Sequence, residues 1–171
     1  MTTKFFTNQG KNTLLEKFEG IFKYTQVENF DALVGYLRAS GYFAIRKFLK
    51  RVPKIRILVG INVDKVIKQY HQAGLEFTSN NGKILEEFNR DLKNDIQGSA
   101  YNKETEEGIL EFIKDVSSKK IEIAAHPSQN IHAKIYIFKP KLFNQHNSGS
   151  VITGSSNLSA TGIGALPESN Y

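Results

Sequence analysis

The sequence contains no cysteine among its 171 residues, and this absence removes several kinds of chemistry at once. It excludes disulfides, thiol catalysis, and zinc or iron–sulfur sites built on thiolates. No apolar run approaches the roughly 20 residues that a membrane-spanning helix needs. The first residues are also too polar for a secretory signal. We therefore expect a cytoplasmic protein with no segment in a membrane.

The composition is that of a folded domain with an excess of basic residues. Apolar residues make up 40% of the chain and charged residues 23%, which is typical of a globular protein. A chain of 171 residues can bury a core of its own, so we expect a single domain over residues 1–171. The 23 lysines and arginines exceed the 17 acidic residues and give a net charge of +6. This charge is compatible with a polyanionic partner or with a merely soluble basic protein.

The basic residues are concentrated between residues 46 and 56, where no acid interrupts them. Five of them are candidates for contact with nucleic acid: Arg46, Lys47, Lys50, Arg51 and Lys54. Between residues 84 and 116, nine acidic residues outnumber four basic ones. This uneven distribution predicts one basic region that a phosphate backbone could contact, although a solvated basic helix face would give the same pattern.

Hydrophobic periodicity predicts a mixed α/β fold. Segments with apolar residues at helical spacing are expected as helices near residues 14–22, 45–52, 66–70, 84–96 and 109–116. Segments with the period of a strand, or with a short apolar run, are expected as strands at 30–37, 55–61, 121–125, 131–138 and 150–154. Residues 40–41 are expected to form a turn or a helix cap. Helices between the early strands, followed by a run of strands, imply a mixed sheet flanked by helices.

The predicted strand 131–138 carries a histidine and a lysine that could act on a phosphate group. Because side chains alternate along a strand, His132 and Lys134 lie on one face, about 7 Å apart along the strand. Tyr136 shares this face and could line the site, although we expect it to be packed. The isoleucines of the strand share the other face, which we expect to be packed. Lys134 could hold a phosphoryl oxygen while His132 attacks phosphorus or transfers a proton.

The strand predicted at 150–154 leads into a short polar segment, Gly154-Ser155-Ser156-Asn157. Glycine allows a ligand to approach the backbone closely. Ser155 and Asn157, two residues apart, can donate hydrogen bonds to the same anion. Together with Lys134, they would form a phosphate-binding site that needs no metal. His126 and His132 are not expected to bind a metal, because no third ligand lies near them in the sequence.

His132-Ala133-Lys134 followed by Gly154-Ser155-Ser156-Asn157 resembles the signature of the phospholipase D superfamily, H-x-K and G-S-x-N. The surrounding NIHAKIYIF and VITGSSNLS are similar to the module of restriction-type endonucleases and of the N-terminus of bacterial Swi/Snf-type helicases. The resemblance covers nearly the whole chain. It implies a phospholipase D-like α/β fold, no metal or cofactor, and DNA as the partner. It also implies an N-terminal fragment of a longer protein, followed by a helicase or DNA-binding domain.

The resemblance implies a role for each matching residue. His132 would attack phosphorus and form a phosphohistidine, while Lys134, Ser155 and Asn157 would bind the phosphoryl oxygens. In the family a second histidine protonates the leaving oxygen. Because H-x-K occurs once here, we expect a homodimer that pairs two copies of His132. Glu168 is a candidate for the glutamate that orients the histidine, which could instead lie beyond the end of this sequence.

One position departs from the longer family pattern, because Lys139 stands where an aspartate follows the lysine by five residues. The endonuclease branch also lacks that aspartate. Three functions remain open. The first is a metal-independent phosphodiesterase on DNA, and the second is a module that binds DNA phosphate without cleaving it, which Lys139 favours. The third is a phospholipase or phosphatidyl transferase, which the basic charge disfavours.

Overall fold

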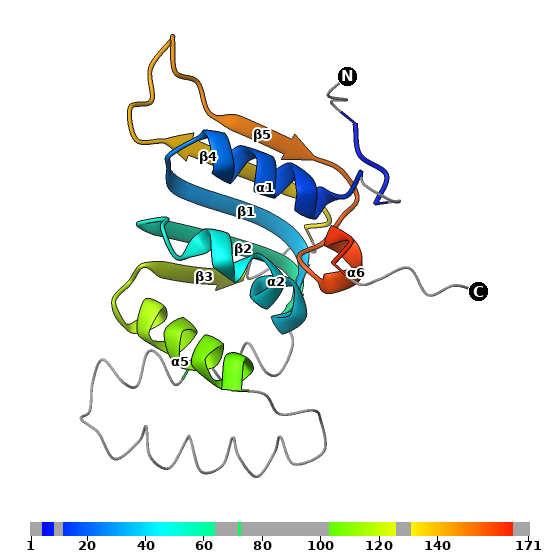
Figure 1. Ribbon diagram of the computed structural model, residues 1–171. Helices are drawn as coiled ribbons and strands as arrows, with labels where there is room; N and C mark the ends of the chain where they lie inside the picture. The colour runs from blue at the N-terminus through cyan, green and yellow to red at the C-terminus, as the bar shows by residue number, and fades with distance from the viewer. Residues whose placement is uncertain (1–4, 9–11, 64–71, 73–102, 126–130, 166–171) are drawn as a thin grey trace.

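The computed structural model describes residues 5–8, 12–63, 72, 103–125 and 131–165. Within these ranges the chain forms a five-stranded mixed sheet and four helices, so the predicted α/β class is confirmed (Figure 1). The strands are β1 (Val27–Leu37), β2 (Lys54–Val63), β3 (Ile121–Ala125), β4 (Ile135–Pro140) and β5 (Ser150–Thr153). The helices are α1 (Leu14–Tyr24), α2 (Ala39–Leu49), α5 (Lys103–Ser117) and α6 (Ala160–Ile163).

The longest strand, β1, lies at the centre of the sheet, whose order is β3-β2-β1-β4-β5. β1 pairs in parallel with β2, and β2 pairs in parallel with β3. In contrast, β4 pairs antiparallel with both β1 and β5. The sheet therefore joins a parallel half to an antiparallel half, and β1 belongs to both.

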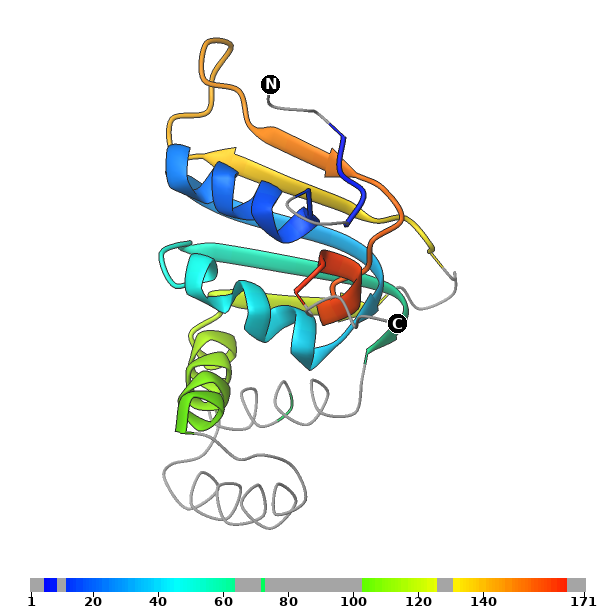
Figure 2. The ribbon, with the colours of Figure 1, turned by 45° about the vertical axis from the view of Figure 1, so that its right-hand side comes forward.

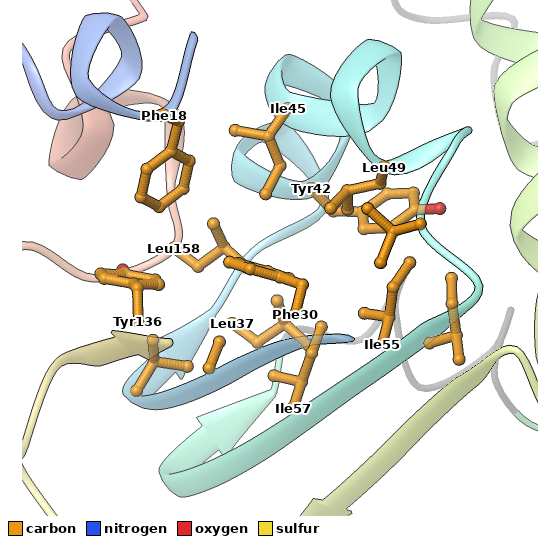
Figure 3. Packing of buried hydrophobic residues seen from close by; sticks show 14 of the residues in the cluster. Phe18, Phe30, Leu37, Tyr42, Ile45, Leu49, Ile55, Ile57, Tyr136 and Leu158 are labelled. Carbon is orange, nitrogen blue, oxygen red and sulfur yellow. The ribbon is translucent and has the colours of Figure 1, made fainter. Parts of the chain in front are cut away.

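The helices enclose the core against one face of the sheet. Figures 1 and 2 show α1, α2 and α6 over the same face. In the close view, Phe18 of α1 and Ile45 of α2 point toward Phe30 and Ile57 of the sheet, and all four side chains are buried (Figure 3). Phe112 of α5 belongs to the same cluster. The burial of these large side chains away from water is the main force that holds the helices on the sheet.

The assignment of the two faces of β4 differs from the prediction. Tyr136 and Phe138 are buried under α1, with ring centroids 5.1 and 5.2 Å from that of Phe18. Ile137 and its cross-strand neighbour Val151, on the other face, are 40% and 61% exposed. Tyr136 is packed, as expected, but the isoleucine face of β4 is the more exposed one, because the larger aromatic rings fill the space beneath α1.

The start of β4 also differs from the prediction, because the strand begins at Ile135 and not at residue 131. Its pairing with β1 ends at Leu33 and Ile135, just before β1 shifts register against β2. Residues 131–134 have no regular partner strand there and form a loop. His132 and Lys134 therefore lie in the loop that precedes β4. The distance of about 7 Å predicted for two residues on one strand does not apply to them.

The remaining expectations have mixed outcomes. Residues 40–41 lie in the first turn of α2, whose N-cap is Arg38, so they form neither a separate turn nor the cap. The helix predicted at 109–116 is confirmed as part of α5. The helices predicted near 66–70 and 84–96 lie outside the described residues. In the part of the chain that the structure describes, no helix is long and apolar enough to cross a membrane.

Candidate functional site

The two polar motifs leave the sheet from the same end of the β4–β5 hairpin. Ile135 faces Thr153 in the last pair of this ladder. One step further, the backbone N–H of Gly154 donates to the carbonyl oxygen of Lys134 at 3.2 Å. The H-x-K loop and the G-S-x-N segment therefore lie side by side, although Gly154 comes 20 positions after Lys134 in the chain. We call this end of the sheet, where His132, Lys134 and Asn157 lie, the site end.

Lys134 is a buried cation, since only 3% of it is exposed. Its Nζ donates to the carbonyl oxygen of His132 at 2.6 Å, which folds the side chain back over its own loop. Burial lowers the pKa of Lys134 below the ordinary 10.5, because the charged form loses hydration. No carboxylate in the described ranges pairs with it. An ammonium group with one hydrogen bond has two donors left for an anion.

His132 lies on the surface of this loop, in contrast to Lys134 two residues later. Its imidazole forms no hydrogen bond or ion pair with the residues that the structure describes. An exposed and unpaired imidazole beside a buried cation is accessible to a phosphate group that the cation attracts. The pair can therefore supply a nucleophile and an electrostatic anchor.

The G-S-x-N segment is anchored to the core on both sides of its asparagine. The hydroxyl of Tyr136 donates to the carbonyl oxygen of Ser156 at 2.7 Å. Leu158 is fully buried, and its carbonyl oxygen accepts a hydrogen bond from the backbone N–H of Arg38 at 3.0 Å. Figure 3 shows Leu158 and Tyr136 on the helix side of the sheet. These anchors hold Asn157 between them and leave Ser155 exposed.

A hydrogen bond to β1 fixes the amide of Asn157. Its Oδ1 accepts from the backbone N–H of Tyr36 at 2.9 Å. Tyr36 follows the register shift of β1 after Val34, where the regular ladder with β2 is interrupted. The Asn157 side chain thus accepts a hydrogen bond from a backbone N–H next to the register shift. Because only an oxygen can accept this hydrogen bond, the atom that faces Tyr36 is Oδ1 and not Nδ2. Nδ2 keeps two donors that no described residue accepts, so it can donate to an anion.

Two glycines allow the motifs to pack this closely, and sequence reasoning did not assign either to the site. Any side chain at Gly60 of β2 would overlap the backbone of Ile131, which starts the H-x-K loop. Any side chain at Gly41 of α2 would overlap the backbone of Leu158, which follows the G-S-x-N segment. Both contacts join residues far apart in the chain, so no local signal could have revealed them.

The basic stretch lies at the opposite end of the sheet. Lys54 begins β2 and Gly60 lies six residues later, which is about 20 Å at the rise of a strand. Arg46 and Lys50 pair with Glu111 at 3.5 and 3.2 Å. The stretch is therefore separated from the site end and partly neutralised.

Of the other three members of the basic stretch, one forms an ion pair within the described ranges and two do not. Lys54 pairs with Glu122 of β3. Lys47 and Arg51 are exposed and have no carboxylate partner among the residues described.

Glu168 and His126 lie outside the described residues. A comparison of the chain with models of known protein families and a comparison with curated proteins both found no match.

Proposed function

We propose that this chain is a phospholipase D-like, metal-independent phosphodiesterase that acts on DNA. The observation that supports this proposal best is the juxtaposition at the site end. Lys134, buried without a carboxylate, and Asn157, with its amide fixed by Tyr36, belong to two motifs that start beside each other. The sequence pattern of these motifs and the basic charge of the chain point to phosphate in a nucleic acid.

The proposed reaction has two displacements. A ring nitrogen of His132 forms a bond to phosphorus while the phosphorus–oxygen ester bond breaks, and the departing oxygen takes a proton from a second histidine. In the second displacement the second histidine, now neutral, takes a proton from a water molecule whose oxygen attacks phosphorus. The nitrogen–phosphorus bond breaks, which releases His132 and leaves a phosphate monoester on the DNA. Lys134, Ser155 and the Nδ2 of Asn157 would bind the phosphoryl oxygens and stabilise their developing charge.

The second histidine is proposed to come from another copy of the chain. An in-line displacement needs the nucleophile and the acid on opposite sides of phosphorus. The exposed His132 is available for a two-fold contact. Glu168 is proposed to orient one of the two imidazoles. In the cell we place this activity in the cytoplasm, within a longer protein that also carries a helicase or DNA-binding domain.

The decisive experiment is plasmid cleavage in excess chelator. The wild-type chain should nick or linearise the plasmid, and His132→Ala should lower the rate at least a hundredfold, because it removes the nucleophile. His146→Ala removes another exposed histidine and should leave the rate unchanged. If His132→Ala retains chelator-resistant cleavage in pure protein, the phosphohistidine mechanism is wrong for this chain.

A non-cleaving phosphate-binding module is the second candidate. It is favoured by the absence of any carboxylate paired with His132 among the residues described, since an orienting acid is what would activate the imidazole. In the same gel this module would retard the plasmid without cutting it. Turnover of a phosphatidyl ester, with no effect on DNA, would instead identify a lipid-directed enzyme.

A further inference from the structure

A pocket of about 730 Å³ lies at the end of the sheet opposite the site end. It is lined by the last residues of α1, the last residues of α2 and the start of β1, and it is open to solvent on one side. We call this end the basic end, because the cations of the pocket lining are Lys23, Lys47 and Arg51. None of the residues assigned to the site end lines this pocket.

The cations of the pocket are not neutralised by neighbouring acids. In the described ranges, Lys23, Lys47 and Arg51 form no ion pair, and Glu19 is the one carboxylate in the lining. This distinguishes them from Lys50, which pairs with Glu111 at 3.2 Å. Lysines in the last turns of α1 and α2 also balance the helix dipoles. Arg51 lies beyond the end of α2 and is not explained in that way.

Aromatic rings lie among these cations. Tyr24 is 81% exposed, and Nζ of Lys23 lies 5.4 Å from the centre of its ring. Phe22 and Phe48 form a stacked pair inside the pocket, with centroids 5.5 Å apart and planes at 6°. Cations interleaved with accessible rings are the arrangement by which proteins hold the phosphates and bases of unpaired nucleotides.

The β4–β5 hairpin extends this surface. The backbone N–H of Lys141, just after β4, donates to the carbonyl oxygen of Gln26 in the pocket lining at 3.2 Å. Phe143 in the hairpin turn is 57% exposed, with Nζ of Lys139 5.3 Å from its ring centre. Figures 1 and 2 both show this turn at the same end of the molecule as the end of α1.

We propose that the basic end binds single-stranded nucleic acid. A base stacks on the ring of Tyr24, and the flanking phosphates contact Lys47 and Arg51. A single strand is favoured over a duplex because only unpaired bases expose their faces to an aromatic ring. This binding needs no residue of the site end, so it does not depend on the proposed cleavage. It assigns to the chain a second nucleic-acid contact, remote from His132.

The test is fluorescence anisotropy with labelled oligo(dT), in the His132→Ala background so that no strand is cut. Tyr24→Ala should weaken binding about tenfold, and Tyr24→Phe, which keeps the ring, should not. Lys47→Ala and Arg51→Ala should each reduce the dependence of log K on log salt by about 0.7. Lys114→Ala removes the same charge from α5 outside the pocket and serves as the matched control.

The outcomes separate this proposal from the one above. A loss of binding in the three pocket variants, with Lys114→Ala unchanged, supports it whether or not the wild-type chain cleaves DNA. Equal affinity of all variants overturns it. Equal affinity for the duplex of the same length, or an unchanged affinity in Tyr24→Ala, overturns the stacking on Tyr24. Oligo(dT) and oligo(U) distinguish DNA from RNA, and free dTMP shows whether one nucleotide suffices.

Discussion

The two ends of the sheet hold their polar groups in opposite ways. At the site end, Lys134 is buried and the amide of Asn157 is fixed by a backbone N–H. At the basic end, Lys47 and Arg51 are exposed and form no ion pair in the described part of the chain, and Nζ of Lys47 lies 4.8 Å from the ring centre of Phe48. Buried groups with fixed orientation select an anion by geometry, whereas exposed cations attract it by charge alone. Substitutions that remove a buried or hydrogen-bonded group at the site end should therefore change stability as well as binding, and those at the basic end should change binding only.

The largest effect is expected at the glycines beneath the site end. Gly41→Ala and Gly60→Ala would each drive a methyl group into the backbone of a neighbouring segment. Backbone cannot move aside as a flexible side chain can, so we expect a loss of about 2 kcal/mol or more in the free energy of unfolding. Urea denaturation followed by circular dichroism measures it.

Gly20→Ala is the matched control for these two substitutions. Gly20 lies in α1, and a methyl group there would meet no atom within 4 Å. Alanine in a helix should stabilise the protein by about 0.5–1 kcal/mol. If Gly41→Ala and Gly60→Ala behave like Gly20→Ala, the close packing that positions the two motifs is not a requirement of the fold.

The next effect separates the two roles of Asn157. Asn157→Ala leaves the N–H of Tyr36 without its acceptor and should cost about 1–3 kcal/mol of stability. Asn157→Asp keeps an oxygen for that N–H but replaces the free NH₂ with a negative charge. It should retain near-normal stability and lose sulfate or phosphate binding. Urea denaturation and calorimetric titration with sulfate distinguish the two variants, and an aspartate variant that still binds sulfate would remove Asn157 from the proposed site.

The sequence alone predicted the fold class, because the period of apolar residues is a local property. It could not predict that β1 is central, since Phe30 pairs with Phe138 more than a hundred residues later. It also could not identify the buried face of β4. Isoleucine alternates there with tyrosine and phenylalanine, so both faces are apolar, and only the position of α1 decides between them.

The candidate site shows the same limit. The histidine, lysine and asparagine were found because they match a recognisable motif. The groups that support them are a backbone N–H at Tyr36, the hydroxyl of Tyr136 and the two glycines. The residues next to each of these groups in the sequence do not indicate that it belongs to the site. The basic stretch was overestimated for a related reason, because Glu111 and Glu122, which pair with it, come from distant elements.

A smaller effect, of opposite sign, is expected at Lys134. Lys134→Met should raise the stability at pH 7 by about 1 kcal/mol, because a buried charge without a carboxylate is replaced by an apolar side chain of similar size. It should also abolish sulfate binding. The difference in the free energy of unfolding between Lys134→Met and wild type should become smaller at high pH. Above the lowered pKa the folded wild type has lost its proton, while the unfolded chain keeps one until about 10.5, so wild-type stability rises with pH in that window.

Chemical denaturation from pH 7 to 11 tests the sign of this dependence. Lys114→Met replaces an exposed lysine of α5. The difference in the free energy of unfolding between this variant and wild type should stay constant over the same pH range. A Lys134→Met variant that is less stable than wild type at neutral pH would mean that the ammonium group has a stabilising partner.

The smallest effect is expected at the basic end, and it completes the comparison. Lys47→Ala removes an exposed cation that has no carboxylate partner in the described residues and lies over the ring of Phe48. Lys50→Ala removes one whose side chain is 50% exposed and paired with Glu111. Exposed ion pairs contribute little, so both variants should unfold within about 0.5 kcal/mol of wild type. Lys47→Ala should nevertheless weaken single-strand binding, which makes it a change in binding at constant stability. A loss of more than about 1 kcal/mol in Lys47→Ala would show that the basic end, like the site end, contributes to the fold, since surface substitutions away from special features stay within about 0.5 kcal/mol.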